Sequence, residues 1–240
     1  MIVRKSVVRP SVGRGIGIAM FSALALALGA CGGGGGDDPA PAPTPAPTPQ
    51  PQPTPLPSPP SVPPLSAPPL VKLQFQDVGT VRQWPQSGDT ATGGQGQAVD
   101  SFTCADPIET YHVHSHLSIF LNGDQLIVPD HIGIPTPGGK ECTYAVHTHD
   151  GSGEIHIEAA AAGTFTLGNF FHIWGQPLDR TNIGGIAGLP ITVYIVDEGK
   201  TTATEYTGDL PTIDLPAHRQ ITIQIGTAIK VIPVYDFNGA

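Results

Sequence analysis

The sequence predicts an all-β domain, a sandwich or barrel of short antiparallel strands with one short helix, which follows a disordered Pro-rich linker. Two observations carry this prediction. Runs of alternating apolar and polar residues recur from residue 71 onward and are rich in Val, Ile, Thr and aromatic residues. Turns that contain Asn-Gly, Gly-Ser-Gly or Pro separate these runs. The runs expected to form strands are 71–76, 113–121, 125–129, 143–149, 154–159, 191–196 and 221–225.

Two local signals define elements within this pattern. The dipeptide Asn122-Gly123 is typical of a tight hairpin and predicts that Ile119 pairs with Leu126 and Leu117 with Val128.

A short helix is expected over 166–174, where Thr166 can cap the first turn. This segment carries Phe170, Phe171, His172 and Trp174.

The first 30 residues have the pattern of an export signal. Four basic residues and no acidic residue occur in the first fourteen, and an apolar run follows over 15–28. That run is shorter than the roughly 20 apolar residues that a spanning helix needs. The next residues, Leu28-Gly29-Ala30-Cys31, resemble the lipobox of bacterial lipoproteins. The resemblance implies cleavage after residue 30, lipidation of Cys31, and a membrane-anchored location in the cell envelope, at the outer membrane or periplasmic face.

Residues 31–70 form the expected spacer. Five glycines are followed by a tract with Pro at nearly every second position, which forbids helix interiors and sheet ladders. As a polyproline II chain, the Pro-containing tract would reach on the order of 90 Å, at about 3.1 Å per residue. The remaining stretch, 71–240, is long enough for one His-rich domain with its own core.

The charge balance excludes nucleic acid as a partner. The chain has 11 Lys plus Arg against 20 Asp plus Glu, and removal of residues 1–30 deletes four basic residues and no acidic ones. The mature chain therefore carries a formal charge of about −13, which repels phosphate backbones.

Three cysteines are present. If Cys31 is lipidated, Cys104 and Cys142 remain as a pair in an oxidising compartment, and a disulfide is expected between them, with soft metal ligation as the alternative. Because each cysteine precedes a histidine-bearing strand, the disulfide would draw the two strands together.

The first histidine cluster lies on one expected strand. His112, His114 and His116 alternate with other residues, so they share one face of an extended chain, opposite an apolar face that contains Leu117 and Ile119.

The second cluster flanks an expected turn at 151–152. This turn would place His147 opposite His156 and His149 opposite Glu154. Opposed Cβ atoms in such pairs lie about 5 Å apart, so two imidazoles can reach one ion.

The two clusters together predict a transition-metal site. Neutral imidazole suits copper and zinc, and the absence of Met near these strands disfavours a thioether Cu(I) site. Glu154 and Glu158 are interpreted as ligands, as groups that orient the imidazoles, or as solvated charges. His131, His172 and His218 are isolated and are interpreted as structural.

Three resemblances bear on this site. The spacing of His147, His149 and Glu154 resembles the first metal motif of cupins, which implies that these side chains bind one metal inside a jelly roll. His112-Val113-His114 resembles the copper-ligand strand of copper-zinc superoxide dismutases, but the C-terminal motif of that family is absent and superoxide chemistry is not expected.

A longer pattern over 104–237 resembles an uncharacterised family of bacterial secreted proteins and implies no activity. Its segments are His112 to Leu117 with Asn122-Gly123, His147 to Asp150, Ile155 to Glu158, Phe165 to Gly168, Trp174 to Leu178 and Tyr235 to Phe237.

The favoured hypothesis is therefore an envelope lipoprotein that binds Cu(II) or Zn(II) through two histidine-bearing strands. A metal-dependent enzyme of cupin-like type, and a stalked structural or adhesion domain with incidental histidines, are the alternatives.

Overall fold

The computed structural model describes residues 61–67, 69–73, 76–86 and 94–237. The predicted signal peptide, Cys31 and the predicted spacer as far as residue 60 lie outside these residues. At the end of the predicted spacer, Leu65 forms a parallel bridge with Ile232, and the Ser66 N–H donates to the Ile232 carbonyl over 2.8 Å. The residues just before 71 thus contact the domain.

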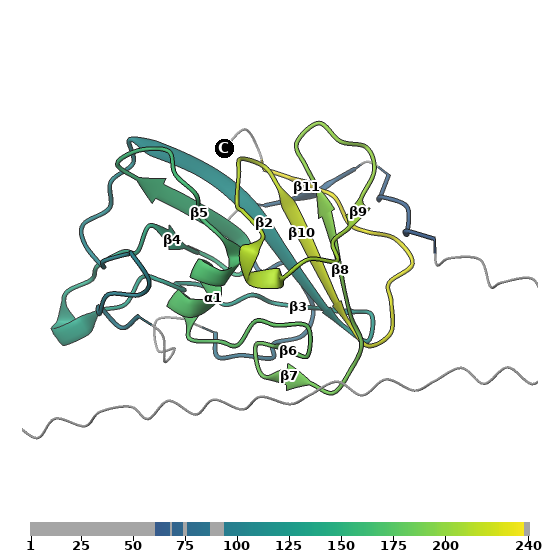
Figure 1. Ribbon diagram of the computed structural model, residues 1–240, viewed down its shortest axis with the longest axis horizontal. Helices are drawn as coiled ribbons and strands as arrows, with labels where there is room; N and C mark the ends of the chain where they lie inside the picture. The colour runs from purple at the N-terminus through teal and green to yellow at the C-terminus, as the bar shows by residue number, and fades with distance from the viewer. Residues whose placement is uncertain (1–60, 68, 74–75, 87–93, 238–240) are drawn as a thin grey trace, which may run out of the picture. The chain divides into compact units, whose positions relative to one another are not determined.

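A seven-stranded sheet organises the domain, with the long strand β2 (Tyr111–Leu121) at its centre (Figure 1). On one side of β2 lie β5 (Glu154–Ala159), β4 (Val146–His147) and β3 (Asp124–Leu126), and on the other lie β10 (Gln220–Ile225), β8 (Ile191–Val196) and β9 (Thr204–Glu205).

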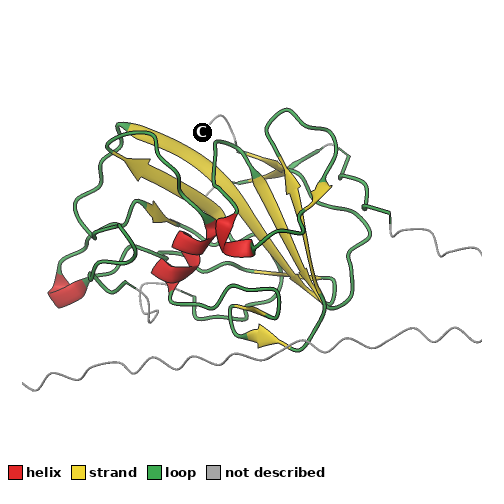
Figure 2. Cartoon of the chain, viewed as in Figure 1, coloured by secondary structure: helices red, strands yellow, loops and turns green. Residues whose placement is uncertain are grey.

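Few helical segments accompany the strands (Figure 2). The smaller elements are the parallel pair β1 (Val71–Lys72) and β11 (Tyr235–Asp236), the hairpin β6 (Asn182–Ile183) and β7 (Ile186–Ala187), the helix α1 (Leu167–Trp174), and the 3₁₀ turns η1 (Pro137–Gly139) and η2 (Leu210–Thr212).

The all-β class and the single short α-helix are confirmed for the described residues. The sheets are open, which favours the sandwich over the barrel. Two pairings differ from the expected antiparallel arrangement, because β10 runs parallel to β2 and β11 runs parallel to β1. Both join segments that are far apart in the chain, whose relative direction no local turn determines.

Helix α1 begins and ends at residues with recognisable capping geometry. The Thr166 hydroxyl accepts from the Asn169 N–H, and the Asn169 side chain accepts from the Thr166 N–H, which together form a capping box. Gly175 ends the helix with φ of 72°, a left-handed conformation that favours glycine. The predicted Thr166 cap is confirmed.

One edge of β2 pairs with two different strands. Its first half pairs with β5, and its end pairs with β3 through the predicted hairpin, in which Ile119 faces Leu126. The hairpin does not extend to the predicted pair of Leu117 and Val128, because the Leu117 N–H donates to the Gly153 carbonyl over 2.9 Å. The pairing of this edge with β5 therefore begins directly where its pairing with β3 ends.

The main core lies against one face of the sheet. Leu117 and Ile119 of β2 are almost completely buried there. Other strands and α1 contribute Val193, Ile155, Ile157, Ile221, Ile223, Ile225, Leu167, Phe170, Phe171 and Trp174.

The opposite face of β2, which carries the histidines, is also partly covered. The Tyr235 ring of β11 packs against the His116 ring at a tilt of 34°, with ring centroids 3.8 Å apart. A second apolar cluster joins Tyr235 to Leu73, Val78 and Phe237.

The predicted disulfide between Cys104 and Cys142 is confirmed. Its Cα atoms lie 5.4 Å apart, and the adjacent residues Ala105 and Thr143 form an antiparallel bridge. The disulfide thus joins the segments that lead into β2 and β4. In the chain-entropy model, closure of a loop with a sequence separation of 38 stabilises the fold by about 4 kcal/mol.

Among the described residues, no helix has the length and apolar character needed to cross a membrane.

Candidate metal site

Three adjacent strands and the turn after β4 bring five histidines and one carboxylate together. Because β5 lies between β2 and β4, His156 is opposite His114 on one side and opposite His147 on the other. The next pair on the same face of the sheet is His112 of β2 opposite Glu158 of β5. The predicted pairing of His147 with His156 is confirmed.

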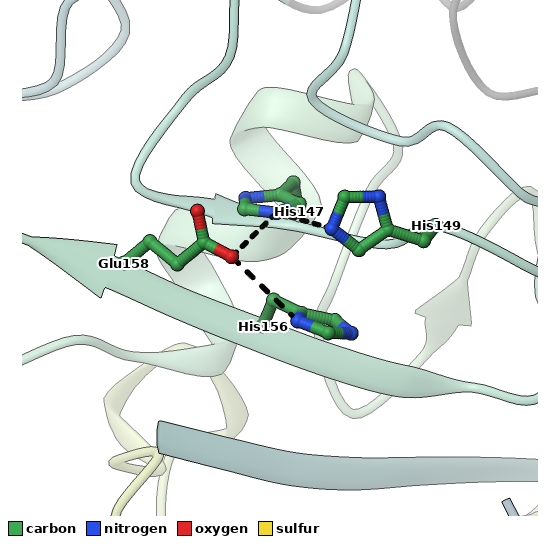
Figure 3. Close-up of side chains that lie close together, drawn as sticks. All are labelled: His147, His149, His156 and Glu158. Atoms are coloured by element: carbon green, nitrogen blue, oxygen red, sulfur yellow. Dashed lines mark hydrogen bonds and ion pairs between the residues drawn. The ribbon is translucent and has the colours of Figure 1, made fainter. Parts of the chain in front are cut away.

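Figure 3 shows one group of these side chains, in which His147, His149, His156 and Glu158 point toward one another. A ligand atom from each lies within 4.8 Å of the ligand atoms of the other three. The two Nε2 atoms of His147 and His149 are 3.2 Å apart, and Glu158 Oε1 lies 3.6 Å from His147 Nε2 and 3.7 Å from His156 Nδ1. His147 and Glu158 are buried, whereas His149 is exposed.

The tautomer of His147 is fixed by the backbone. Its Nδ1 lies 2.9 Å from the Tyr144 carbonyl oxygen, which can only accept a hydrogen bond. The proton of neutral His147 is therefore on Nδ1, and the Nε2 lone pair points into the group. A second hydrogen bond that orients the imidazole in this way is typical of metal-ligating histidines.

Without a metal ion or a proton on His147 Nε2, this arrangement brings two acceptors together. The His147 Nε2 lone pair faces Glu158 Oε1, which is also an acceptor when Glu158 is ionised. The pKa of Glu158 is lowered, chiefly by the hydrogen bond that His147 donates when its Nε2 is protonated, so Glu158 is ionised at neutral pH. A cation between the two atoms would replace their repulsion with two attractive contacts.

A second group shares His156 with the first. It consists of His112, His114 and His156, whose closest ring nitrogens lie 2.9, 3.0 and 3.4 Å apart. Each nitrogen is either a donor or an acceptor, so at least one of the three pairs must join two of the same kind. Nitrogens of a tetrahedral metal centre lie about 3.3 to 3.4 Å apart when each metal–nitrogen bond is about 2.0 to 2.1 Å. The observed triangle is close to that size.

Three imidazoles of this site, those of His114, His149 and His156, have the neutral form that binds metals. Burial, reinforced by His112, lowers the pKa of His114 to about 4. Burial and the surrounding histidines lower the pKa of His156 to about 2, and the same causes lower the pKa of His149. A metal ion therefore does not have to displace protons from these three side chains at neutral pH.

Glu154 lies outside both groups, although the cupin-like spacing implies that it is a ligand with His147 and His149. The β4 strand ends at His147, so the predicted pair of His149 and Glu154 does not form. Glu154 Oε1 instead lies 3.8 Å from His114 Nδ1, and neither atom has a hydrogen-bond partner in the described part of the chain. Burial raises the pKa of Glu154 to about 7.

His116 also lies outside both groups. Its Nε2 donates to the Ser152 carbonyl over 2.9 Å, and its ring is fully buried against Tyr235. Burial lowers the pKa of His116 to about 4.

The three remaining histidines lie outside both groups, and each faces a carboxylate. His131 contacts Asp130, His172 contacts Asp100 and His218 contacts Glu198.

A cavity of about 410 Å³ borders the site at Glu158. Its walls include Ile108, Tyr144 and Phe165. No sequence pattern indicates this cavity, because its walls come from separate segments of the chain.

Comparisons of the chain with protein-family models, curated proteins and solved structures found no significant match.

Proposed function

We propose that this chain is a transition-metal-binding lipoprotein of the cell envelope, with His147, His149, His156 and Glu158 as ligands. The observation that carries the proposal is the convergence of these four side chains within 4.8 Å. The fixed tautomer of His147 and the contact of its lone pair with Glu158 support it, because both features favour a cation at this position.

The donor set favours Cu(II) or Zn(II). Imidazole nitrogens with one carboxylate are typical zinc ligands, and the same atoms bind Cu(II) more tightly at equal availability. Ca²⁺ and Mg²⁺ prefer sites formed entirely by oxygen ligands.

The proposal is tested by metal analysis of the purified chain without a histidine tag. After incubation with Zn(II) or Cu(II) and desalting, we expect retained metal in the wild type and at least a tenfold loss of retention in the double variant His147→Ala/His156→Ala. The matched control is His131→Ala/His172→Ala, which removes two histidines outside both groups. Wild-type chain that retains no metal would contradict the proposal.

The membrane anchor is tested separately. We expect the chain to incorporate radiolabelled palmitate in a bacterial host and to fractionate with membranes, and we expect Cys31→Ser to abolish both results. Unlabelled wild-type chain in the soluble fraction would contradict the anchor and leave the metal proposal unaffected.

A metal-dependent enzyme is the second candidate, and the cavity at Glu158 is the observation that favours it. His149 is exposed, so the site is open to solvent at that ligand. A bound zinc would supply a water with a pKa near 7, and the cavity would hold a small substrate beside it. Electron spin-echo measurements on the Cu(II)-loaded chain in D₂O test this candidate. It requires an exchangeable water on the metal, and a saturated metal without one would contradict it.

A further inference from the structure

We infer that the site is dinuclear, with one ion bound by His112 and His114, a second bound by His147 and His149, and His156 and Glu158 between them. The inference rests on the proposed metal-binding function and specifies how many ions that function involves. It is carried by the position of β5 in the sheet, by the contacts of its two side chains, and by the number of donors that converge.

The strand order gives each ion its own pair of histidines. His112 and His114 come from β2, on one side of β5, whereas His147 and His149 come from β4 and the turn after it, on the other side. The nitrogens of the first pair are 2.9 Å apart and those of the second pair are 3.2 Å apart. Each pair therefore converges on its own point. Both nitrogen–nitrogen distances are close to the separation of two nitrogens bound to one metal.

His156 belongs to both groups of donor atoms. Its Nδ1 lies 3.0 Å from His114 Nε2 and 3.7 Å from Glu158 Oε1. The ring stacks on His147 at 5.5 Å between centroids and meets His149 edge-on at 4.5 Å. A neutral imidazole has one lone pair and one N–H, so His156 can bind an ion through each ring nitrogen only as imidazolate, with the second N–H proton released to solvent.

Glu158 connects the two histidine pairs as well. Its Oε1 lies 3.4 Å from His112 Nε2 and 3.6 Å from His147 Nε2, so one carboxylate oxygen faces a nitrogen of each pair. An ionised carboxylate has about four lone-pair positions on two oxygens and can bind two cations at once. Its negative charge also reduces the repulsion between two neighbouring cations.

A single ion would leave part of this arrangement unused. A tetrahedral metal takes four ligands, and six side chains converge here. One ion in the group of His147, His149, His156 and Glu158 leaves His112 and His114 to face each other without a metal. Two ions that share His156 and Glu158 use all six side chains.

The first test is the number of ions bound. Calorimetric titration of the purified full chain with Zn(II), with elemental analysis of the desalted product, should give two ions per chain. His112→Ala/His114→Ala and His147→Ala/His149→Ala should each retain one. One ion in the wild type, unaffected by loss of His112 and His114, would overturn the dinuclear inference and leave the proposed function intact. No bound ion would overturn both.

The second test is magnetic. Two Cu(II) ions that share a bridging ligand couple, so the integrated electron paramagnetic resonance signal of the loaded wild type should be well below its copper content. Each double variant should restore one full spin per copper. A full, uncoupled signal from wild type that holds two coppers would overturn the sharing of His156 and Glu158.

Folding of the variants is checked by circular dichroism and thermal unfolding without metal. His114 is buried whereas His112 is exposed, so the single variant His112→Gln serves if the double variant fails to fold. It should weaken binding of one ion at least tenfold and leave the other unchanged. If His112→Gln binds both ions as tightly as the wild type does, the inference is contradicted.

Discussion

At the scale of single residues, the site depends on which atom each side chain presents. The Tyr144 carbonyl fixes the Nε2 lone pair of His147, and burial keeps the imidazoles of His114 and His156 neutral. Strand alternation in the sequence correctly placed His112 and His114 on one face. It could not separate His116 from them, because the residue that covers His116 is Tyr235, which lies far from it along the chain.

The two carboxylates of β5 should differ in their effect on metal affinity. Glu158→Gln removes an ionised oxygen that faces His112, His147 and His156, so we expect Zn(II) affinity to fall about 10- to 100-fold, roughly 1.4 to 2.7 kcal/mol. Glu154→Gln should have a smaller effect, because Glu154 reaches only the far side of His114. Competition with a chromophoric chelator measures both variants. A larger loss in Glu154→Gln would favour the cupin-like ligand set instead.

Tyr235 should make the fold sensitive to alkaline pH. Burial raises the pKa of Tyr235 to about 12, from 10.0 in the unfolded chain. Between pH 10 and 12 the unfolded chain loses this proton while the folded chain keeps it, so stability is complete below pH 10 and falls as the pH rises. The slope for this group should approach roughly 1.4 kcal/mol per pH unit.

Urea unfolding of the wild type and Tyr235→Phe between about pH 9 and 12 measures this effect. We expect the variant to lose less stability over this range, although other buried tyrosines still contribute to its slope. Identical slopes in the two proteins would contradict the assignment to Tyr235.

At the scale of elements, the position of β5 determines the site. The register of β4 with β5 followed from the turn at 151–152, because a short connection leaves few alternatives. The pairing of β5 with β2 had no such signal, since a long connection separates these strands and many registers satisfy the same alternation. The sequence therefore identified the histidines on both strands but not the row that joins them, in which His114 is opposite His156.

Gly153 should be essential where β5 joins the edge of β2. Its φ is +83°, and a Cβ would overlap the Leu117 carbonyl oxygen, which lies at the end of the β2–β5 ladder. We expect Gly153→Ala to lower the free energy of unfolding by about 1 to 3 kcal/mol or more.

The matched control for this variant is Gly123→Ala. Gly123 also has a positive φ, of +97°, but a Cβ added to it in the open hairpin turn would meet no atom within 4 Å. The difference between the two variants in denaturant unfolding isolates the steric overlap. Equal losses of stability would show that the overlap with Leu117 does not matter.

At the scale of the whole molecule, metal binding and folding should be linked. The ligands come from β2, β4, β5 and the turn after β4, which assemble only in the native state, so an ion stabilises the fold. At a free Zn(II) concentration about 100 times Kd, one site adds about 2.7 kcal/mol.

This stabilisation corresponds to a rise in Tm of roughly 5 to 10 °C for a domain of this size. Differential scanning calorimetry with Zn(II), and with Mg²⁺ as the control cation, measures it. An equal response to both cations would indicate nonspecific attraction to the acidic surface rather than a built site.

The most direct test of the metal site is a crystal structure of the Zn(II)-loaded chain with anomalous diffraction at the zinc edge. We predict an anomalous peak among His147, His149, His156 and Glu158, with zinc–nitrogen distances of about 2.0 to 2.1 Å. Anomalous density absent from these side chains, or present only at exposed residues such as His131, would contradict a metal site at this position.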